Sequence, residues 1–268
     1  MMKTTLLPLS LKEPRNRLAD MAGYITHFDT EKIYLCHVLE GNNTNERHNR
    51  IESALGDIAE IFRDKGMSTE TIIRHGNIAD EISALAQELN VDYISIKWKK
   101  KNVLRRSILG SPDADILRMS DFPAFIYKYR SYLNSITQLK RVVYATDTKE
   151  TDINILPYLT SVPTGADSLH LLHVRTRAPD PKTDKQRLQE VEAKLQRLAD
   201  QCKDSYKKVG ITITVGGIRS QIARNAKKLN ADLIVIGKKD KKKPMEKLVG
   251  STAESIPYRS HCPVLIIP

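Results

Sequence analysis

The sequence contains an internal repeat that spans both of its halves. A shift of 140 positions aligns residues 76–128 with residues 216–268 without a gap, and 17 of the 53 pairs are identical. Upstream the shift falls to 136 or 137 and places Ser10 on Asp147. Loops of different length between the same elements account for that change. The repeat therefore predicts two similar domains in tandem, and 268 residues are enough to give each domain its own core.

Each half alternates short apolar runs with amphipathic segments. The apolar runs predict buried strands, and the alternation predicts a parallel sheet with helices on both faces. In the first half the strands are expected at Thr4 to Leu9, Ile33 to Leu39, Thr69 to Arg74, Asp92 to Lys97 and Ala124 to Tyr129. In the second half they are expected at Arg141 to Thr146, Ser168 to Val174, Ile211 to Val215, Asp232 to Gly237 and Val264 to Ile267. The fold class is therefore α/β, with two doubly wound domains.

The helix after each second strand has the clearest apolar periodicity in the chain. Its apolar face is formed by Ile51, Leu55, Ile58 and Phe62 in the first half, and by Leu188, Val191, Leu195, Leu198 and Cys202 in the second. We expect Gly66 and Gly210 to end these helices, because glycine tolerates the left-handed conformation that commonly follows a helix. Residues 129–139 are polar and lack a period, which predicts a connection between domains 1–130 and 138–268.

Composition bounds the class of protein. A hydrophobic fraction of 40% and a charged fraction of 28% are typical of a globular protein. No apolar run approaches the roughly 18 residues of a membrane span, and the first residues do not form a secretory signal, so we expect a cytoplasmic protein. The three cysteines show no paired spacing, which argues against a disulfide framework or a zinc site.

The net charge of +11 is concentrated in two segments, Lys97 to Arg106 and Lys238 to Lys247. Such charge would suit an anionic partner. A surface that reads nucleic acid usually interleaves aromatic residues with the charges, and only Trp98 does so here. The composition therefore favours solvated loops over binding of nucleic acid.

The segment that leaves the fourth strand of the second half has the outline of a phosphate site. The strand ends at Gly237, a lysine-rich loop follows, and Gly250-Ser251-Thr252 opens a helix. A glycine lets the backbone approach a ligand closely, and amides at a helix N-terminus bind phosphate. An alternative stays open, because Ser251 and Glu254 also form a capping box that simply starts the helix.

Other catalytic and metal-binding patterns are absent from the sequence. There is no Walker-type phosphate loop, no dinucleotide fingerprint and no recognisable nucleophile with its base. His170 and His173 lie three apart on an expected strand, so their side chains point to opposite faces and cannot share a metal ion.

Taken together, these features resemble the universal stress protein family in both halves. The resemblance rests on Asp147 after the first strand, the His-Val ending of the second strand, the glycine spacing that ends in Gly-Ser, and the C-terminal Cys-Pro-Val-Leu-Ile-Ile. It implies a five-stranded parallel sheet of order 3-2-1-4-5 in each domain. Nucleotide-binding members of the family hold ATP beside strands one and four, and that is also where the strand order of such a sheet reverses.

The resemblance also implies roles for residues of the second domain. Asp147 takes the position that meets the adenine or ribose side of the nucleotide, and the backbone of Val174 takes the position along the base. Gly237, Gly250 and Ser251 take the positions of the phosphate loop.

Both domains depart from the family's pattern. In the second domain Asp240 replaces a loop glycine, and its carboxylate would either repel a triphosphate or hold a magnesium ion. In the first domain Ser10 stands in place of the acid, and Lys97 and Lys100 replace the two loop glycines. We therefore expect the first domain to be a structural partner that has lost the nucleotide, although its lysines leave a different anion open.

These observations predict a stress-response protein whose second domain binds ATP or a related adenine nucleotide, with magnesium, without major catalysis. Slow hydrolysis stays open, although no general base can be named. The alternative is an interaction or scaffold protein of the same fold that binds no nucleotide. The resemblance further implies that the two domains pair through their fifth strands, and it leaves assembly into a homo-oligomer open.

Overall fold

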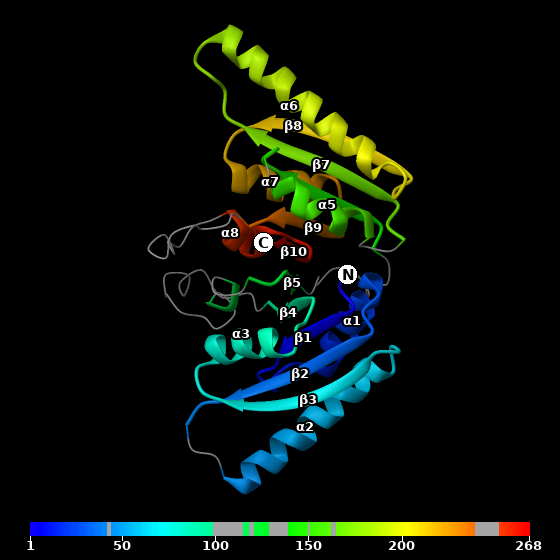
Figure 1. Cartoon of the computed structure of the whole chain (residues 1–268), viewed down its shortest axis with the longest axis vertical. Coiled ribbons are helices and arrows are strands. Elements are labelled where there is room, and N and C mark those ends of the chain that lie inside the picture. The colour runs from blue at the N-terminus through cyan, green and yellow to red at the C-terminus, as the bar shows by residue number, and fades with distance from the viewer. Residues whose placement is uncertain are drawn as a thin grey trace. The chain divides into compact units, whose positions relative to one another are not determined.

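The structure is a computed structural model, and it describes residues 1–41, 44–98, 115–117, 121–128, 139–149, 151–161, 165–238 and 252–268. The chain divides into two compact units, Met1–Gln138 and Leu139–Pro268 (Figure 1). Each unit is described by itself.

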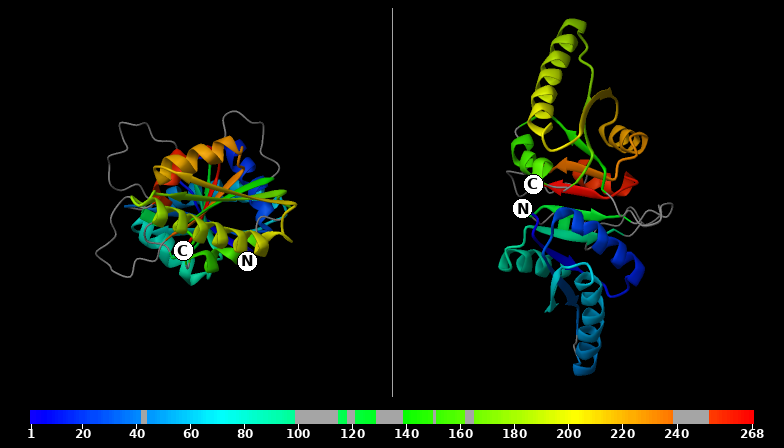
Figure 2. Two further views of the ribbon diagram at one scale, coloured as in Figure 1. Left: turned by 90° about the horizontal axis from the view of Figure 1, so that it is seen from above. Right: turned by 90° about the vertical axis from the view of Figure 1, so that its right-hand side faces the viewer.

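The first unit is a parallel five-stranded sheet with helices on both faces. Its elements in chain order are β1 (Thr4–Pro8), α1 (Arg15–Ile25), the 3-10 turn η1 (Thr26–Phe28), β2 (Lys32–Leu39), α2 (Asn45–Arg63), β3 (Ser68–His75), α3 (Ile78–Glu88), β4 (Tyr93–Lys97) and β5 (Ala124–Tyr127). The strand pairings give the order β3-β2-β1-β4-β5. Helices α1 and α2 lie on one face of this sheet and α3 lies on the other (Figure 2).

The second unit repeats this arrangement. Its elements are β6 (Arg141–Thr146), α5 (Thr151–Ser161), β7 (Ser168–Arg175), α6 (Pro181–Cys202), β8 (Lys208–Val215), α7 (Ile218–Lys228), β9 (Leu233–Gly237), α8 (Thr252–Arg259) and β10 (Val264–Ile267). The order is β8-β7-β6-β9-β10, again all parallel. The predicted α/β fold and the strand order 3-2-1-4-5 are thereby confirmed in both units.

The predicted helix faces pack against the sheets. In α2 the side chains of Ile51, Leu55, Ile58 and Phe62 are buried, and in α6 those of Leu195, Leu198 and Cys202 are buried. Leu188 and Val191 of α6 are only partly covered. The N-terminal half of α6 therefore contributes less to the core than its periodicity predicts.

The two units also share unusual backbone conformations at equivalent positions. Leu11 and Thr148 have φ of 60° and 58°, and Asn90 and Asn230 have φ of 46° and 51°. Residues other than glycine rarely adopt positive φ. The repeat seen in the sequence is therefore a repeat of backbone geometry, including the turn that leaves the first strand of each unit.

The expectation that Gly210 ends a helix is wrong. Gly66 follows α2 with φ of 84°, as predicted, whereas Gly210 lies inside β8 and pairs with His170 of β7. An added Cβ at Gly210 would stand 2.6 Å from Nδ1 of His170. Glycine is needed here for a close approach between strands rather than for a left-handed turn.

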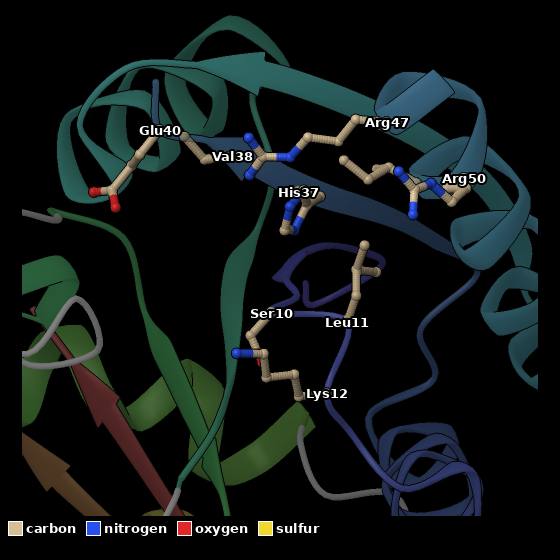
Figure 3. A pocket seen from close by; sticks show the side chains of 9 residues that line it. Ser10, Leu11, Lys12, His37, Val38, Glu40, Arg47 and Arg50 are labelled. Carbon is tan, nitrogen blue, oxygen red and sulfur yellow. The ribbon is translucent and has the colours of Figure 1, made fainter. Parts of the chain in front are cut away.

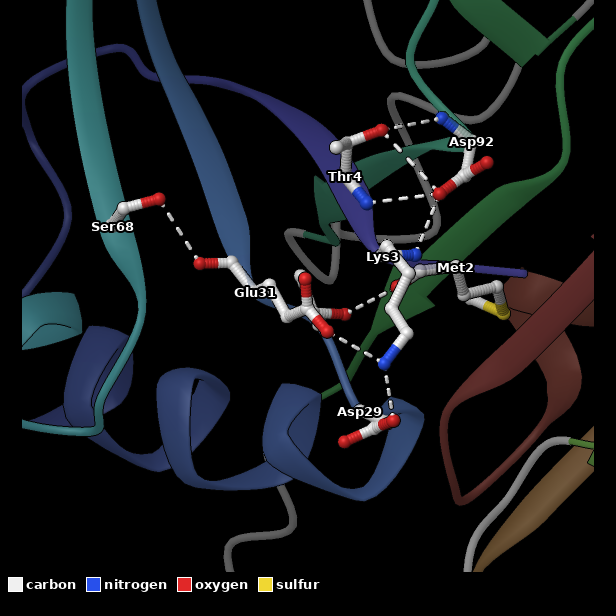
Figure 4. A network of polar contacts seen from close by, with 8 residues as sticks. Met2, Lys3, Thr4, Asp29, Glu31, Ser68 and Asp92 are labelled. Carbon is white, nitrogen blue, oxygen red and sulfur yellow. Dashed lines mark hydrogen bonds and ion pairs between the residues drawn. The ribbon is translucent and has the colours of Figure 1, made fainter.

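An aspartate holds together the amino ends of the first and fourth strands in each unit. In the first unit one carboxylate oxygen of Asp92 accepts from the backbone nitrogens of Lys3 and Thr4, at 2.6 and 3.0 Å, and the backbone nitrogen of Asp92 donates to the hydroxyl of Thr4 (Figure 4). In the second unit Asp232 accepts from the backbone nitrogens of Lys140 and Arg141, at 3.3 and 2.9 Å. This equivalence explains why both aspartates occur in the repeat.

Several expectations stay predictions. The connection at residues 129–139 lies outside the described residues except for Leu139. Pairing of the units through their fifth strands likewise stays a prediction. Within the described part of the chain, none of the helices is both long enough and apolar enough to span a bilayer.

Candidate functional site

The candidate site of the second unit lies at the carboxyl edge of its sheet, between β6 and β9. Strand β6 pairs with β7 as far as Thr146 opposite His173, and with β9 as far as Ala145 opposite Ile236. The next residues on these strands are the site residues. Asp147 leaves β6, Val174 lies near the end of β7, and Gly237 ends β9. The order of the strands reverses here, and open α/β sheets bind ligands at such a point.

Asp147 is presented by a strained turn. It is partly exposed, and the following residue, Thr148, is buried with φ of 58°. Three hydrogen bonds hold that conformation: Thr148 donates its backbone nitrogen to Oγ1 of Thr146 at 2.7 Å and its hydroxyl to the carbonyl of Asp147 at 2.8 Å, and Lys194 donates to the carbonyl of Thr148 at 3.4 Å. A β-branched residue at positive φ costs of order 1–3 kcal/mol and persists only where its surroundings enforce it.

A second carboxylate, Asp152 at the start of α5, lies beneath this turn. Its Oδ1 accepts hydrogen bonds from the hydroxyl of Thr146 at 2.6 Å and from the hydroxyl of Tyr144. Burial raises the pKa of Asp152, and the two hydroxyl donors partly oppose that shift. Burial also raises the pKa of Tyr144, with the negative charge of Asp152 adding to the effect. Asp152 therefore fixes the end of β6 through its Oδ1.

The two histidines of β7 have separate partners. His173 is buried and its Nδ1 lies 2.9 Å from the carbonyl oxygen of Thr146, so Nδ1 must carry the proton and donate. Nε2 of His170 lies 2.6 Å from the hydroxyl of Thr212 on β8. The structure thus joins each histidine to a neighbouring strand, and His173 fastens β7 to the end of β6.

The phosphate end of the predicted site is described only in part. Gly237 pairs with Ile267 of β10, and the backbone nitrogen of Lys238 donates to the carbonyl of Ile267 at 2.6 Å. Thr252 is the first residue of α8. Asp240, Gly250 and Ser251 lie outside the described residues. The described chain therefore brings Asp147, Val174 and Gly237 to one edge of the sheet, while the loop that would complete the site is a prediction.

The first unit presents the equivalent edge differently. Ser10 takes the place of Asp147, and Leu11 repeats the positive φ of Thr148. The hydroxyl of Ser10 donates to Glu13 at 2.6 Å, and Nδ1 of His37 lies 2.8 Å from the carbonyl of Leu9. The histidine bond thus recurs in both units, whereas the acid does not.

A cavity of about 610 Å³ opens beside Ser10 (Figure 3). Its polar lining consists of Ser10, Lys12, His37, Glu40, Arg47 and Arg50. The sequence singled out neither arginine, because arginines three apart near the start of a helix look like an ordinary solvated face. The cavity belongs to the first unit, the copy that was expected to be altered, whereas the predicted nucleotide site belongs to the second.

Comparison with known proteins identifies the family. The sequence profile described as "Universal stress protein family" matches residues 1–128 and 138–268. The chain belongs to this family. Since the two matches cover both units, the protein carries two universal stress protein domains in tandem.

Individual proteins are similar to this chain in sequence or in fold. Universal stress protein G of Escherichia coli O157:H7 is 28% identical over 145 residues, which are 48% of this chain and 100% of that protein. The crystal structure of a universal stress protein from Archaeoglobus fulgidus DSM 4304 is 24% identical, covers 98% of this chain and 95% of that chain, and superimposes with a TM-score of 0.76. The length of that match supports the tandem fold.

Solved structures that are similar to part of this chain include complexes with a nucleotide. A universal stress protein from Archaeoglobus fulgidus in complex with dAMP is 19% identical, covers 48% of this chain and 100% of that chain, and has a TM-score of 0.38. The complex is a property of that relative, and ligand binding by the present universal stress protein is a separate question.

Proposed function

We propose that the second unit of this universal stress protein binds an adenine nucleotide, with ATP and magnesium as the expected ligand. The observation that carries the proposal is the convergence of Asp147, Val174 and Gly237 at the switch point of a parallel sheet. Three strands contribute one residue each to this edge, and the strained turn at Thr148 fixes the first of them.

The proposed roles follow from the chemistry of these residues. The carboxylate of Asp147 accepts hydrogen bonds from the ribose hydroxyls or the adenine amino group, and the backbone of Val174 lies along the base. Gly237 lets the backbone come close to the phosphates because it has no Cβ. The N-terminus of α8, which begins at Thr252, supplies amides and a positive dipole end to the phosphates. Asp240, Gly250 and Ser251 complete the loop, with Asp240 as the candidate magnesium ligand.

We further propose that the nucleotide is held rather than hydrolysed rapidly. Catalysis of hydrolysis requires a base or a positioned water beside the terminal phosphate. The carboxylate of Asp152 accepts the hydroxyls of Tyr144 and Thr146, so this acid is occupied in holding the end of β6. The role that best fits the site is therefore sensing or storage of the nucleotide.

Isothermal titration calorimetry of the whole chain with ATP and magnesium tests the proposal. The wild type is expected to bind, and Gly237→Arg is expected to lose binding because the side chain fills the space of the phosphates. Gly56→Arg is the matched control, since a Cβ at Gly56 on α2 meets no atom within 4 Å. Folding of each variant is checked by circular dichroism.

The alternative function is that of a scaffold that binds no nucleotide in either unit. A folded wild type that shows no heat of binding at millimolar ATP would favour the scaffold and overturn the proposal. Equal binding by the wild type and Gly237→Arg would place the nucleotide elsewhere.

A further inference from the structure

The cavity of the first unit has a lining that the equivalent residues of the second unit do not share. The loop after β1 forms one wall with Ser10 and Lys12, and the first turns of α2 form the opposite wall with Arg47 and Arg50. Figure 3 shows both guanidinium groups reaching over the cavity, with the ring of His37 between the two walls. A volume of about 610 Å³ falls in the range of small-molecule pockets.

The equivalent positions of the second unit can be identified from buried residues. Leu55 and Phe62 of α2 are fully buried, as are Leu195 and Cys202 of α6, so the two helices correspond at a shift of 140. Arg50 then corresponds to Glu190.

The loop after the first strand corresponds at a shift of 137, which places Ser10 on Asp147 and Lys12 on Lys149. The carboxylates of Asp147 and Glu190 in the second unit are thus replaced in the first unit by the hydroxyl of Ser10 and the guanidinium of Arg50, respectively.

These two exchanges change the charge of the region. Lys12, Arg47 and Arg50 contribute three positive charges to the cavity lining and Glu40 contributes one negative charge, a net of +2. In the second unit the corresponding residues are Lys149, Arg187, Glu190 and Thr176, to which Asp147 adds a second negative charge. Their sum is zero. The first unit therefore lacks the acid that is proposed to meet an adenosine in the second unit, and its lining has instead a net positive charge that suits an anion.

We propose that this cavity binds a small phosphorylated molecule, with its phosphate group between Arg47 and Arg50. Guanidinium groups donate paired hydrogen bonds that match the oxygens of a phosphate. The phosphate would lie at the α2 side of the sheet edge, away from the loop after β4. The site is independent of the nucleotide site proposed for the second unit.

The neighbouring groups support a ligand with a phosphate and an organic part. Nδ1 of His37 donates to the carbonyl of Leu9, so the imidazole is held in place beneath the arginines. Val38 and Ile51 are mostly buried and provide apolar contact for the rest of the molecule. Ser10 itself is uncharged where the second unit has Asp147, and its hydroxyl donates a hydrogen bond of 2.6 Å to the carboxylate of Glu13.

Two acidic residues near the arginines limit the affinity without blocking the site. Glu46 lies 3.6 Å from Arg50 one helical turn away, but both side chains are largely exposed. Exposed ion pairs contribute little, so Arg50 can exchange this partner for a phosphate. Glu40 also lines the cavity, and its carboxylate disfavours ligands with further negative charge on that side.

Isothermal titration calorimetry of the whole chain with ribose 5-phosphate tests the proposal, and inorganic phosphate and citrate serve as comparison probes. The variants Arg50→Glu and Ser10→Asp replace residues of the first unit by those found at the equivalent positions of the second. Each is expected to weaken binding of ribose 5-phosphate at least tenfold, roughly the effect of losing one charged contact. Arg63→Glu at the other end of α2 is the matched control and is expected to change affinity less than about twofold.

The possible outcomes separate this site from the nucleotide site. Unchanged binding of ribose 5-phosphate by Gly237→Arg, together with loss in Arg50→Glu, supports the proposal whether or not ATP binds the second unit. The proposal would be overturned if neither ribose 5-phosphate nor inorganic phosphate binds at about 5 mM, since a dissociation constant of that size corresponds to a binding free energy of only ~3 kcal/mol. Equal weakening in Arg63→Glu, or citrate binding as tightly as ribose 5-phosphate, would also overturn it.

Discussion

Replacement of Asp232 by alanine is expected to destabilise the second unit. The side chain is 6% exposed and accepts hydrogen bonds from the backbone nitrogens of Lys140 and Arg141. Without the carboxylate these two nitrogens lose their acceptor at the amino end of β6. Each hydrogen bond to a charged group contributes about 1.5–3 kcal/mol, and an orphaned donor costs about 1–3 kcal/mol.

The expected loss in the free energy of unfolding lies at the lower end of the sum of these hydrogen-bond contributions. Lys140 and Arg141 are exposed residues, so water replaces part of what the carboxylate supplied. The guanidinium of Arg141 also lies 3.3 Å from the carboxylate, but the arginine side chain is 47% exposed and this pair adds less than about 1 kcal/mol. We therefore expect Asp232→Ala to lower the free energy of unfolding by about 2–3 kcal/mol.

Differential scanning calorimetry of the whole chain measures this effect. For a unit of this size each kcal/mol corresponds to a few degrees, so a fall in Tm of about 6–12 °C is expected for the transition of the second unit. Asp204→Ala, at an exposed position in the same unit, is the control. Asp232→Asn keeps one acceptor oxygen and should cost less. A change in Tm of under about 1 °C for Asp232→Ala would refute the reasoning, because backbone donors that lose a charged acceptor cost stability even where water replaces part of it.

Two further predictions concern the second unit. Burial raises the pKa of Asp152, so the folded state binds its proton more tightly than the unfolded state, and the contribution of Asp152 to stability falls as pH rises from about 4 through that raised pKa. Asp152→Asn should therefore gain stability relative to the wild type across this window in chemical denaturation, and a relative loss there would contradict the assignment. Gly210→Ala should cost about 1–3 kcal/mol, because the Cβ would displace the ring of His170 from its 2.6 Å contact with Thr212. The control Gly56→Ala should be neutral or stabilising by up to about 1 kcal/mol, and equal effects of the two changes in thermal denaturation would rule out the steric explanation.

The sequence predicted where the strands lie because its signals are local and repeated, whereas the order of the strands was implied by the resemblance to the family. Buried parallel strands leave compact apolar runs, as in Leu233–Gly237 and Val264–Ile267, and the internal repeat supplied each boundary twice. Edge strands lack such runs. Strand β8 begins at Lys208, before the expected Ile211, and this earlier start turned the expected helix-ending Gly210 into a strand residue.

The candidate site was predictable to the extent that it depends on where strands end. Asp147, Val174 and Gly237 reach one edge for that reason. The strained turn at Thr148 was not predictable, because threonine gives no signal for positive φ and the conformation depends on Thr146 and Lys194.

The cavity of the first unit escaped prediction for a different reason. Arg47 and Arg50 lie at a spacing typical of a solvated helix face, and only the fold places them opposite Ser10. Comparison of the equivalent residues Glu190 and Asp147 in the second unit is the signal that could have revealed it, once the helices were aligned.

Native mass spectrometry of the whole chain with ATP and magnesium tests the central claim most directly, because it counts bound nucleotides. The claim is that the second unit alone carries a nucleotide site, with Asp147 and Gly237 at its edge. We expect one adenine nucleotide per wild-type chain and none on folded Gly237→Arg. A folded wild type that carries no nucleotide at millimolar ATP, or one that carries two, would contradict the account.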